Sequence, residues 1–161
     1  IPTMPSYFDE KSGVVRCQTP WGFWYQTVEE VVIEIEDKLP LTKRDITVRA
    51  KPNHLLVVVR GQELIKGNLD GIVVEDETIW TIEDQRFLRI TLSKADVGTK
   101  DACWEGLLQS EFRADPFTFH EMRKKFDLER FQIENPGFDF SSAKLDKRYE
   151  DAFVRKTKST E

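Results

Sequence analysis

Apolar and polar side chains alternate along several stretches of the chain, which is the pattern of half-buried β-strands. In residues 29–36, for example, Val31, Ile33 and Ile35 face one way and the glutamates between and after them face the other. Residues 55–59 are apolar on both faces, which predicts an interior strand. The predicted strands cover residues 29–36, 45–51, 55–59, 62–69, 78–83 and 86–93.

Turn-forming residues separate these strands at short intervals, and no helical stretch lies between them. A parallel sheet needs long crossover connections, usually helices, so we expect the strands to pair antiparallel. Short strands punctuated in this way are typical of a β-sandwich. The predicted fold class is therefore all-β, an antiparallel β-sandwich of about seven strands followed by a short C-terminal α-helical extension.

Beyond residue 100 the apolar spacing changes to three and four, which predicts helices. Asp115 followed by Pro116 is a strong start signal, because Asp caps a helix and Pro fits its first position. Asp101 and Asp127 are placed to cap two further short helices, the second ending at residues 135–137. The apolar residues of the three helices are Trp104, Leu107 and Leu108; Phe119, Met122 and Phe126; and Leu128 and Phe131.

The charge of the chain is unevenly distributed over four expected parts. The formal net charge is −5, and it lies entirely within residues 21–108, which hold 11 basic and 16 acidic residues. This acidity argues against a nucleic-acid partner, which needs a cationic surface. No apolar run approaches the roughly 20 residues that span a bilayer, and no signal peptide is recognisable, so no membrane partner is expected. The four parts are an N-terminal segment (1–20), the β-domain (21–108), the helical extension (109–143) and a charged tail that we expect to fray (144–161).

Residues with catalytic or metal-binding chemistry are few and scattered. Cys17 and Cys103 are too isolated for a disulfide framework or a metal site, so we expect reduced thiols in a cytoplasmic protein, with the nucleus left open. His54 and His120 lie in no nucleophile motif, and no phosphate-binding loop occurs. We therefore expect no catalytic residue, cofactor or metal. An enzyme is the weakest alternative, which a pocket holding His54 and a carboxylate would favour.

Two further features each allow a structural and a binding interpretation. Residues 75–77, Glu-Asp-Glu, lack the spacing of a calcium-binding loop. They are either a solvated loop or part of an acidic rim that faces a partner. Trp24 and Trp80 lie within strands, so we expect them to pack inside the sandwich rather than bind a ligand.

Five short motifs follow one another in order and at regular distances along the chain. They are WYQT at residues 24–27, IKGNL at 65–69, ETIWTIED at 77–84, WEGLL at 104–108 and NPGFDFSSA at 135–143. Together they resemble the CS domain, which is shared by small acidic co-chaperones of the ninety-kilodalton heat-shock chaperone and by the NudC (nuclear distribution protein C) family. The last three motifs are similar to NudC-family signatures. The resemblance implies a sandwich like that of the small heat-shock proteins.

The resemblance also implies a function. It implies a non-enzymatic co-chaperone and adaptor that binds the ninety-kilodalton heat-shock chaperone and stabilises clients such as the lissencephaly-linked WD-repeat regulator of dynein. This leaves microtubule structures open as a further location. Stabilisation needs only preferential binding to the folded client. The sequence lacks the long acidic tail of the smallest CS co-chaperone, so a tail-dependent mechanism is not carried over. The alternative is a direct holdase that shields exposed client strands at the edges of the sandwich.

For the partner surface we single out four basic residues that alternate with apolar positions or adjoin them on neighbouring predicted strands: Arg49, Lys51, Arg60 and Lys66. They are expected to form one patch on one sheet face, and a basic patch steers an acidic partner. The alternative is that they are ordinary solvent-side charges. A homodimer through the C-terminal helices is a further option, because the helices carry apolar surface at Phe117, Phe119, Met122, Phe126 and Phe131.

Overall fold

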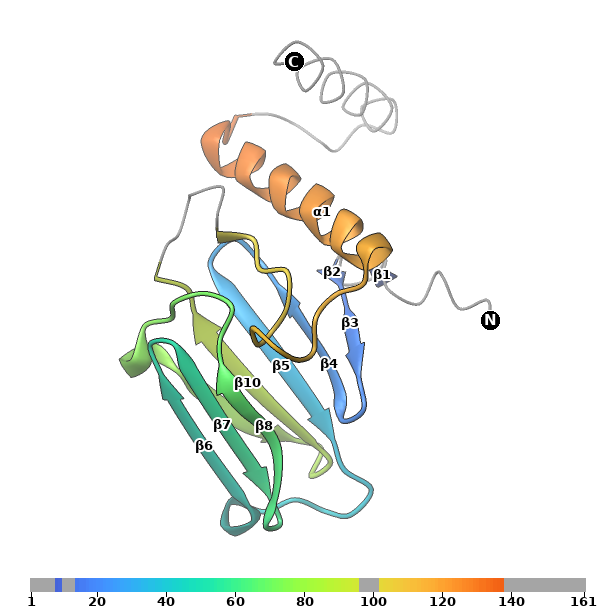
Figure 1. Cartoon of the computed structure of the whole chain (residues 1–161), viewed down its shortest axis with the longest axis vertical. Helices are drawn as coiled ribbons and strands as arrows, with labels where there is room; N and C mark the ends of the chain where they lie inside the picture. The colour runs from blue at the N-terminus through green and yellow to red at the C-terminus, as the bar shows by residue number, and fades with distance from the viewer. Residues whose placement is uncertain (1–7, 10–13, 96–101, 138–161) are drawn as a thin grey trace. The chain divides into compact units, whose positions relative to one another are not determined.

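Two antiparallel sheets contain most of the strands of the chain (Figure 1). The computed structural model describes residues 8–9, 14–95 and 102–137. Their elements, in order, are β1 (Phe8–Asp9), β2 (Val14–Val15), β3 (Cys17–Thr19), β4 (Gly22–Gln26), β5 (Glu30–Glu36), η2 (Lys43–Asp45), β6 (Ile46–Lys51), β7 (His54–Val59), β8 (Gln62–Asn68), η3 (Glu75–Glu77), β9 (Ile79–Glu83), β10 (Phe87–Ser93) and α1 (Pro116–Glu134). No helix among these residues is long and apolar enough to cross a membrane.

The strand order explains how a chain of short hairpins makes a sandwich. One sheet has the order β3-β4-β5-β10-β9 and the other the order β6-β7-β8, while β1 and β2 pair separately. Inward side chains of both sheets form one core, in which Val31, Ile33 and Ile35 are at most 1% exposed. Burying a side chain of this size contributes ~1.5–3 kcal/mol. The predicted antiparallel β-sandwich is confirmed, and the six predicted strands correspond to β5 through β10.

The chain divides into two compact units, Ile1–Arg130 and Phe131–Glu161. The sandwich and most of α1 belong to the first unit. In the second unit, the end of α1 is closed by two bonds from Asn135, whose backbone N–H and side-chain amide both donate to the carbonyl of Phe131.

Helix α1 begins where the sequence predicts, because Asp115 caps it. The Asp115 carboxylate accepts hydrogen bonds from the backbone N–H of Thr118 at 2.7 Å and from its hydroxyl at 3.0 Å. The prediction of a second short helix starting at Asp127 is wrong, since α1 continues without a break to Glu134. Asp127 lies inside the helix and pairs with Arg123, one turn earlier, at 3.4 Å. The predicted end before residues 135–137 is confirmed.

Residues 102–115, which we call the closing segment, are irregular. The predicted short helix carrying Trp104, Leu107 and Leu108 is therefore wrong, although all three side chains are buried; its expected cap, Asp101, lies outside the described residues. The backbone of the segment bonds both to itself, through non-helical loop bonds such as that from Ala114 N–H to the carbonyl of Glu105 at 2.9 Å, and to the β8 side of the sandwich. There Gln109 N–H donates to Asn68 at 2.9 Å, and Leu108 forms a bridge with Leu69. Gly106, a poor helix former, lies in its middle.

A buried polar network fixes the start of the closing segment. The amide of Gln26 on β4 donates to the carbonyl of Trp104 at 2.7 Å and accepts from the N–H of Trp104 at 2.8 Å. These are the two bonds that a neighbouring strand would make. The ammonium of Lys94, only 3% exposed, donates to Gln26 at 2.8 Å and to the carbonyl of Ala102 at 2.6 Å. It also lies 5.0 Å from the ring centre of Phe126 on α1, so β4, the residue that follows β10, the closing segment and α1 meet at one point.

Removing the buried charge of Lys94 should change how stability depends on pH. Burial lowers the pKa of Lys94 from 10.5 to about 8, while the nearby Cys103 and Glu129 act in the opposite direction. Between these values the unfolded chain binds more protons at this site, so the contribution of Lys94 to the free energy of unfolding rises with pH. Chemical denaturation from pH 7 upward measures the free energy of unfolding of the native protein minus that of Lys94→Met. This difference should increase by up to about 1.4 kcal/mol per pH unit.

The matched control is Lys124→Met, because Lys124 is exposed on α1. This variant should differ from the native protein by an amount that does not change with pH. A pH-independent difference for Lys94→Met as well would contradict the prediction.

Trp104 leaves no room for a side chain at Gly71. A Cβ at that position would lie 2.4 Å from Nε1 of Trp104, whose backbone is held by Gln26. We expect Gly71→Ala to lower the free energy of unfolding by ~1–3 kcal/mol, the usual cost of overpacking, in urea denaturation. Gly137→Ala is the control, because a Cβ added at Gly137 has no atom within 4 Å. Equal shifts for the two variants would show that Trp104 does not constrain Gly71.

Candidate partner-binding surface

The outward side of the three-stranded sheet brings basic and apolar side chains together. Register pairs Arg49 on β6 with Leu56 on β7, and Leu56 with Lys66 on β8. The next row in one direction is Lys51, His54 and Asn68, and in the other Thr47, Val58 and Glu63. We call these nine residues the outer face. It carries three basic side chains and one carboxylate, so its local charge is positive although the chain is acidic.

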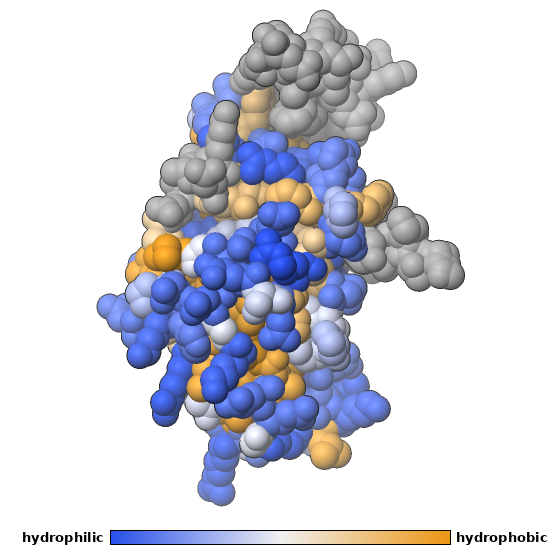
Figure 2. Space-filling view, viewed as in Figure 1, coloured by the Kyte–Doolittle hydropathy of each residue, from blue (hydrophilic) through white to orange (hydrophobic). Residues whose placement is uncertain are grey.

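The centre of the outer face is apolar. Leu56 and Val58, both on β7, are only half-buried because no described element covers them. Figure 2, which looks onto this sheet, shows apolar surface over β7 and β8 bordered by hydrophilic side chains. Apolar centres with polar rims are typical of protein–protein interfaces. The sequence signal for this centre is the run at residues 55–59, which is apolar on both faces although only one face of β7 lies in the core.

The basic side chains of the outer face are largely available to a partner. Within the described residues, neither Arg49 nor Lys51 forms an ion pair; Lys66 lies 3.7 Å from Glu63, with both side chains more than half exposed. An exposed pair of this kind contributes little to stability.

The opposite sheet differs, because its cations are already engaged. Arg89 donates to the hydroxyl of Tyr25 at 2.9 Å and lies 3.6 Å from Glu34, and Arg86 pairs with Glu36 at 3.0 Å. Burial raises the pKa of Glu34, while Arg89 favours its charged form. This arrangement leaves the outer face of β6–β8 as the better candidate for an acidic partner.

The structure brings three of the four predicted residues together and places Arg60 elsewhere. Arg49, Lys51 and Lys66 share the outer face, whereas Arg60 lies in the β7–β8 turn with a φ of 52°. Its guanidinium donates to the Asp37 carboxylate at 2.6 Å and to the carbonyl of Pro40. Arg60 therefore ties this turn to the connection between β5 and β6. Strand alternation alone does not reveal this, because the contact spans 23 positions.

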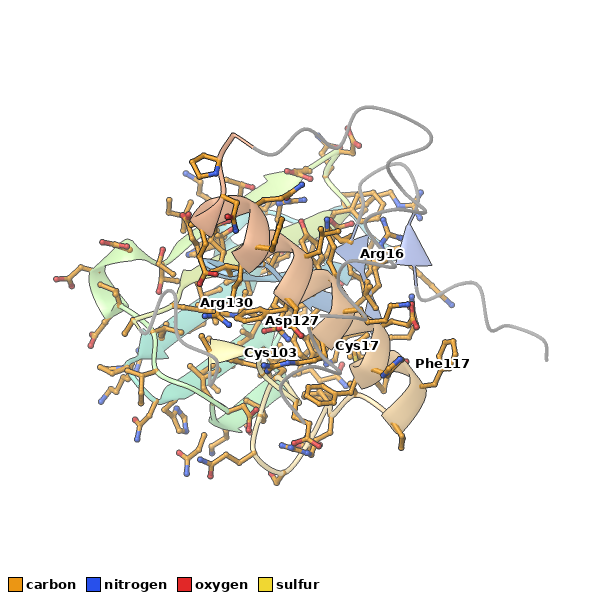
Figure 3. The ribbon with its side chains drawn as sticks, turned by 90° about the horizontal axis from the view of Figure 1, so that it is seen from above. Arg16, Cys17, Cys103, Phe117, Asp127 and Arg130 are labelled. Atoms are coloured by element: carbon orange, nitrogen blue, oxygen red, sulfur yellow. The ribbon has the colours of Figure 1, made fainter. Side chains whose placement is uncertain are left out.

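The scattered reactive residues do not form a catalytic or metal arrangement within the described chain. Burial raises the pKa of the Cys17 thiol to about 11 and also raises that of Cys103, so both are protonated at neutral pH. Figure 3 shows Cys103 beside α1, near Asp127. No group of three His, Cys, Asp or Glu side chains in the described residues could hold a metal ion.

The two histidines lie apart from each other in the fold. His54 begins β7 on the outer face, and His120 lies on α1. A surface hollow of about 380 Å³ contains His120 with Glu105 and Arg123, but not His54. Trp24 is fully buried and donates to the carbonyl of Phe112 at 2.9 Å, and Trp80 is half-buried against the core, so both pack inside the sandwich as expected.

Removing the Arg60 side chain should destabilise the sandwich more than removing a cation of the outer face. Arg60→Ala loses the bonds to Asp37 and Pro40, and we expect a loss of about 1 kcal/mol because the pair is partly exposed. Arg49→Ala, the matched control, should remain within about 0.5 kcal/mol of the native protein in urea denaturation. The assignment of Arg60 to a structural role fails if the two variants unfold at the same midpoint.

Comparison with known proteins agrees with the motifs. The CS domain family matches residues 20–94. NudC domain-containing protein 2 of Rattus norvegicus is 46% identical over 148 residues, covering 91% of this chain and 92% of the relative, and the Homo sapiens protein gives the same values. The crystal structure of NudC domain-containing protein 2 from Mus musculus matches with 46% identity and a TM-score of 0.45, covering 82% of this chain and 100% of that one. The chain therefore belongs to the NudC family of CS-domain proteins.

Proposed function

We propose that the protein is a non-enzymatic co-chaperone and adaptor that binds the ninety-kilodalton heat-shock chaperone through its outer face. Family membership supports the class of function, and the relatives carry no enzyme name. The single observation behind the choice of surface is the apolar centre at Leu56 and Val58, flanked by Arg49 and Lys66.

The apolar and the charged residues of such a surface contribute differently to binding. Burial of Leu56 and Val58 against a partner removes apolar area from water and supplies affinity. Arg49, Lys51 and Lys66 attract an acidic partner and raise the association rate more than the affinity. Client stabilisation requires only that the protein bind the folded or assembling client in preference to the unfolded one. No bond is made or broken in this mechanism.

The proposed clients are WD-repeat proteins such as the lissencephaly-linked dynein regulator, and the proposed location is the cytoplasm. We also propose a homodimer through the C-terminal helices, although the structure leaves less apolar surface exposed there than the sequence suggests. Met122 and Phe126 are each 2% exposed and pack within their own domain, whereas Phe117 is 49% exposed. Light scattering on the full chain measures this directly.

A second candidate, direct holdase activity, is favoured by one observation. Strand β9 is at the edge of the five-stranded sheet and no described strand pairs with its other side. An unpaired edge can pair with an extended segment of another protein. Suppression of client aggregation without the heat-shock chaperone would distinguish this activity from the adaptor function.

Reversing two charges on the outer face tests the proposal. We expect Arg49→Glu combined with Lys66→Glu to weaken binding to the purified ninety-kilodalton chaperone by at least about tenfold in calorimetric titration, with little change in the unfolding midpoint. The matched control is Lys38→Glu combined with Lys124→Glu, which changes the net charge equally at exposed positions elsewhere.

The control variant distinguishes an effect of the outer face from a general effect of net charge. It should bind the chaperone with native affinity. Unchanged binding by the outer-face variant, or equal losses in both variants, would rule out the outer face as the docking site.

A further inference from the structure

The sandwich is closed along one side and open along the other. The closing segment covers the β8 edge, where Leu108 bridges Leu69 and Gln109 donates to Asn68. The other edge strands of the two sheets are β3, β6 and β9, and no described strand pairs with the outer edge of β6 or β9. Figure 1 shows β6 at the edge of its sheet opposite β8. Within the described residues β9 pairs only with β10, so every second residue of β9 directs its backbone N–H and C=O away from the sheet.

The open side has an apolar seam. Trp80 and Ile82 of β9 and Val48 and Ala50 of β6 are only half-buried, and all four pack against the same core cluster. On the other face of β9, Ile79 is 62% exposed, the most exposed of the large apolar side chains in the described chain. A strand added beside β9 would therefore meet apolar side chains on both of its faces.

Carboxylates flank this apolar strand at both ends. Glu75, Asp76 and Glu77 precede it in η3, and Glu83 and Asp84 end it. Residues 75–84 thus hold five acidic residues and no basic one. None of the five forms an ion pair within the described residues, so their field is not cancelled locally.

We propose that the β9 edge binds an extended segment of a partner protein that has aliphatic side chains in its middle and Lys or Arg at its ends. Main-chain hydrogen bonds to β9 would supply affinity, Ile79 would contact the aliphatic side chains, and the carboxylates would select basic ends. A second copy of the chain is a poor occupant, because antiparallel pairing of two β9 strands brings two sets of five carboxylates together. This site differs from the outer face in location and in the sign of its charge.

The probe is a fluorescent peptide of sequence Lys-Lys-Val-Thr-Val-Thr-Val-Lys-Lys, titrated into the full chain. One control peptide carries Glu in place of every Lys. A second is N-methylated at alternate residues, which removes outward N–H donors but keeps the charge and the side chains. We expect binding of the parent peptide, no binding of the Glu peptide, and at least about tenfold weaker binding of the N-methylated peptide.

Two protein variants locate the binding. Ile79→Lys should weaken binding by at least about fivefold, because it removes an apolar contact and adds a repelling charge. Ile72→Lys is the matched control, since Ile72 is 45% exposed and lies outside β9; it should bind as the native chain does. Amide hydrogen exchange of residues 79–83 should slow when the parent peptide binds.

Four results would overturn the proposal. Equal binding of the N-methylated peptide would show charge attraction without strand pairing, and protection confined to β6–β8 would move the site to the outer face. Absence of binding would show that the carboxylates only keep the edge free of partners. A dimer in light scattering that Ile79→Lys abolishes would make a second copy the occupant.

Discussion

The pairing of the Gln26 amide with the backbone of Trp104 is the constraint on which the arrangement depends. Buried polar groups must be hydrogen-bonded, and a side-chain amide has the donor and acceptor needed to replace a neighbouring strand. Because the Gln26 side chain bonds the backbone of Trp104 as a neighbouring strand would, the closing segment can remain irregular and still bury Trp104, Leu107 and Leu108. Lys94 adds a charged donor to the same oxygen, and its ammonium faces Phe126, so the attachment of α1 depends on the same buried point.

Closing one side of the sandwich determines what the other surfaces can do. The β8 edge is covered and contributes to the core, which leaves the outer face of β6–β8 and the β9 edge exposed. These two surfaces have opposite charge, since the outer face has three basic residues to one acidic and residues 75–84 have only acidic ones. The net charge of −5 therefore gives no sign of the positive outer face. Under the two proposals above, the protein would hold an acidic partner on one surface and a basic partner on the other, as an adaptor does.

The sequence predicts features that depend on neighbouring residues and misses those that depend on distant ones. Strands β5 through β10 follow from alternation, and the start of α1 follows from Asp115 and Pro116. The apolar spacing of Trp104, Leu107 and Leu108 predicts a short helix, yet the backbone of Trp104 bonds to Gln26, 78 positions away. Arg60 likewise occupies an expected surface position, but its partner Asp37 is brought to it by the β5–β6 connection. The alternation of strand residues does predict that Arg49, Lys51 and Lys66 share one sheet face.

Three of the five family motifs, those at residues 24–27, 65–69 and 104–108, have mainly structural roles here, whereas residues 138–143 of the last motif lie outside the described residues. Trp24 and Gln26 hold the closing segment, and Gly67 leaves only enough room for Leu108, whose Cδ1 would lie 3.1 Å from an added Cβ. Leu107 and Leu108 fill the core. Residues that serve the scaffold in this way specify the CS fold without specifying a partner. Partner choice must then depend on the exposed positions within and between the motifs, such as Arg49, Leu56 and Ile79, where a substitution changes the surface while the closing segment and the core stay in place.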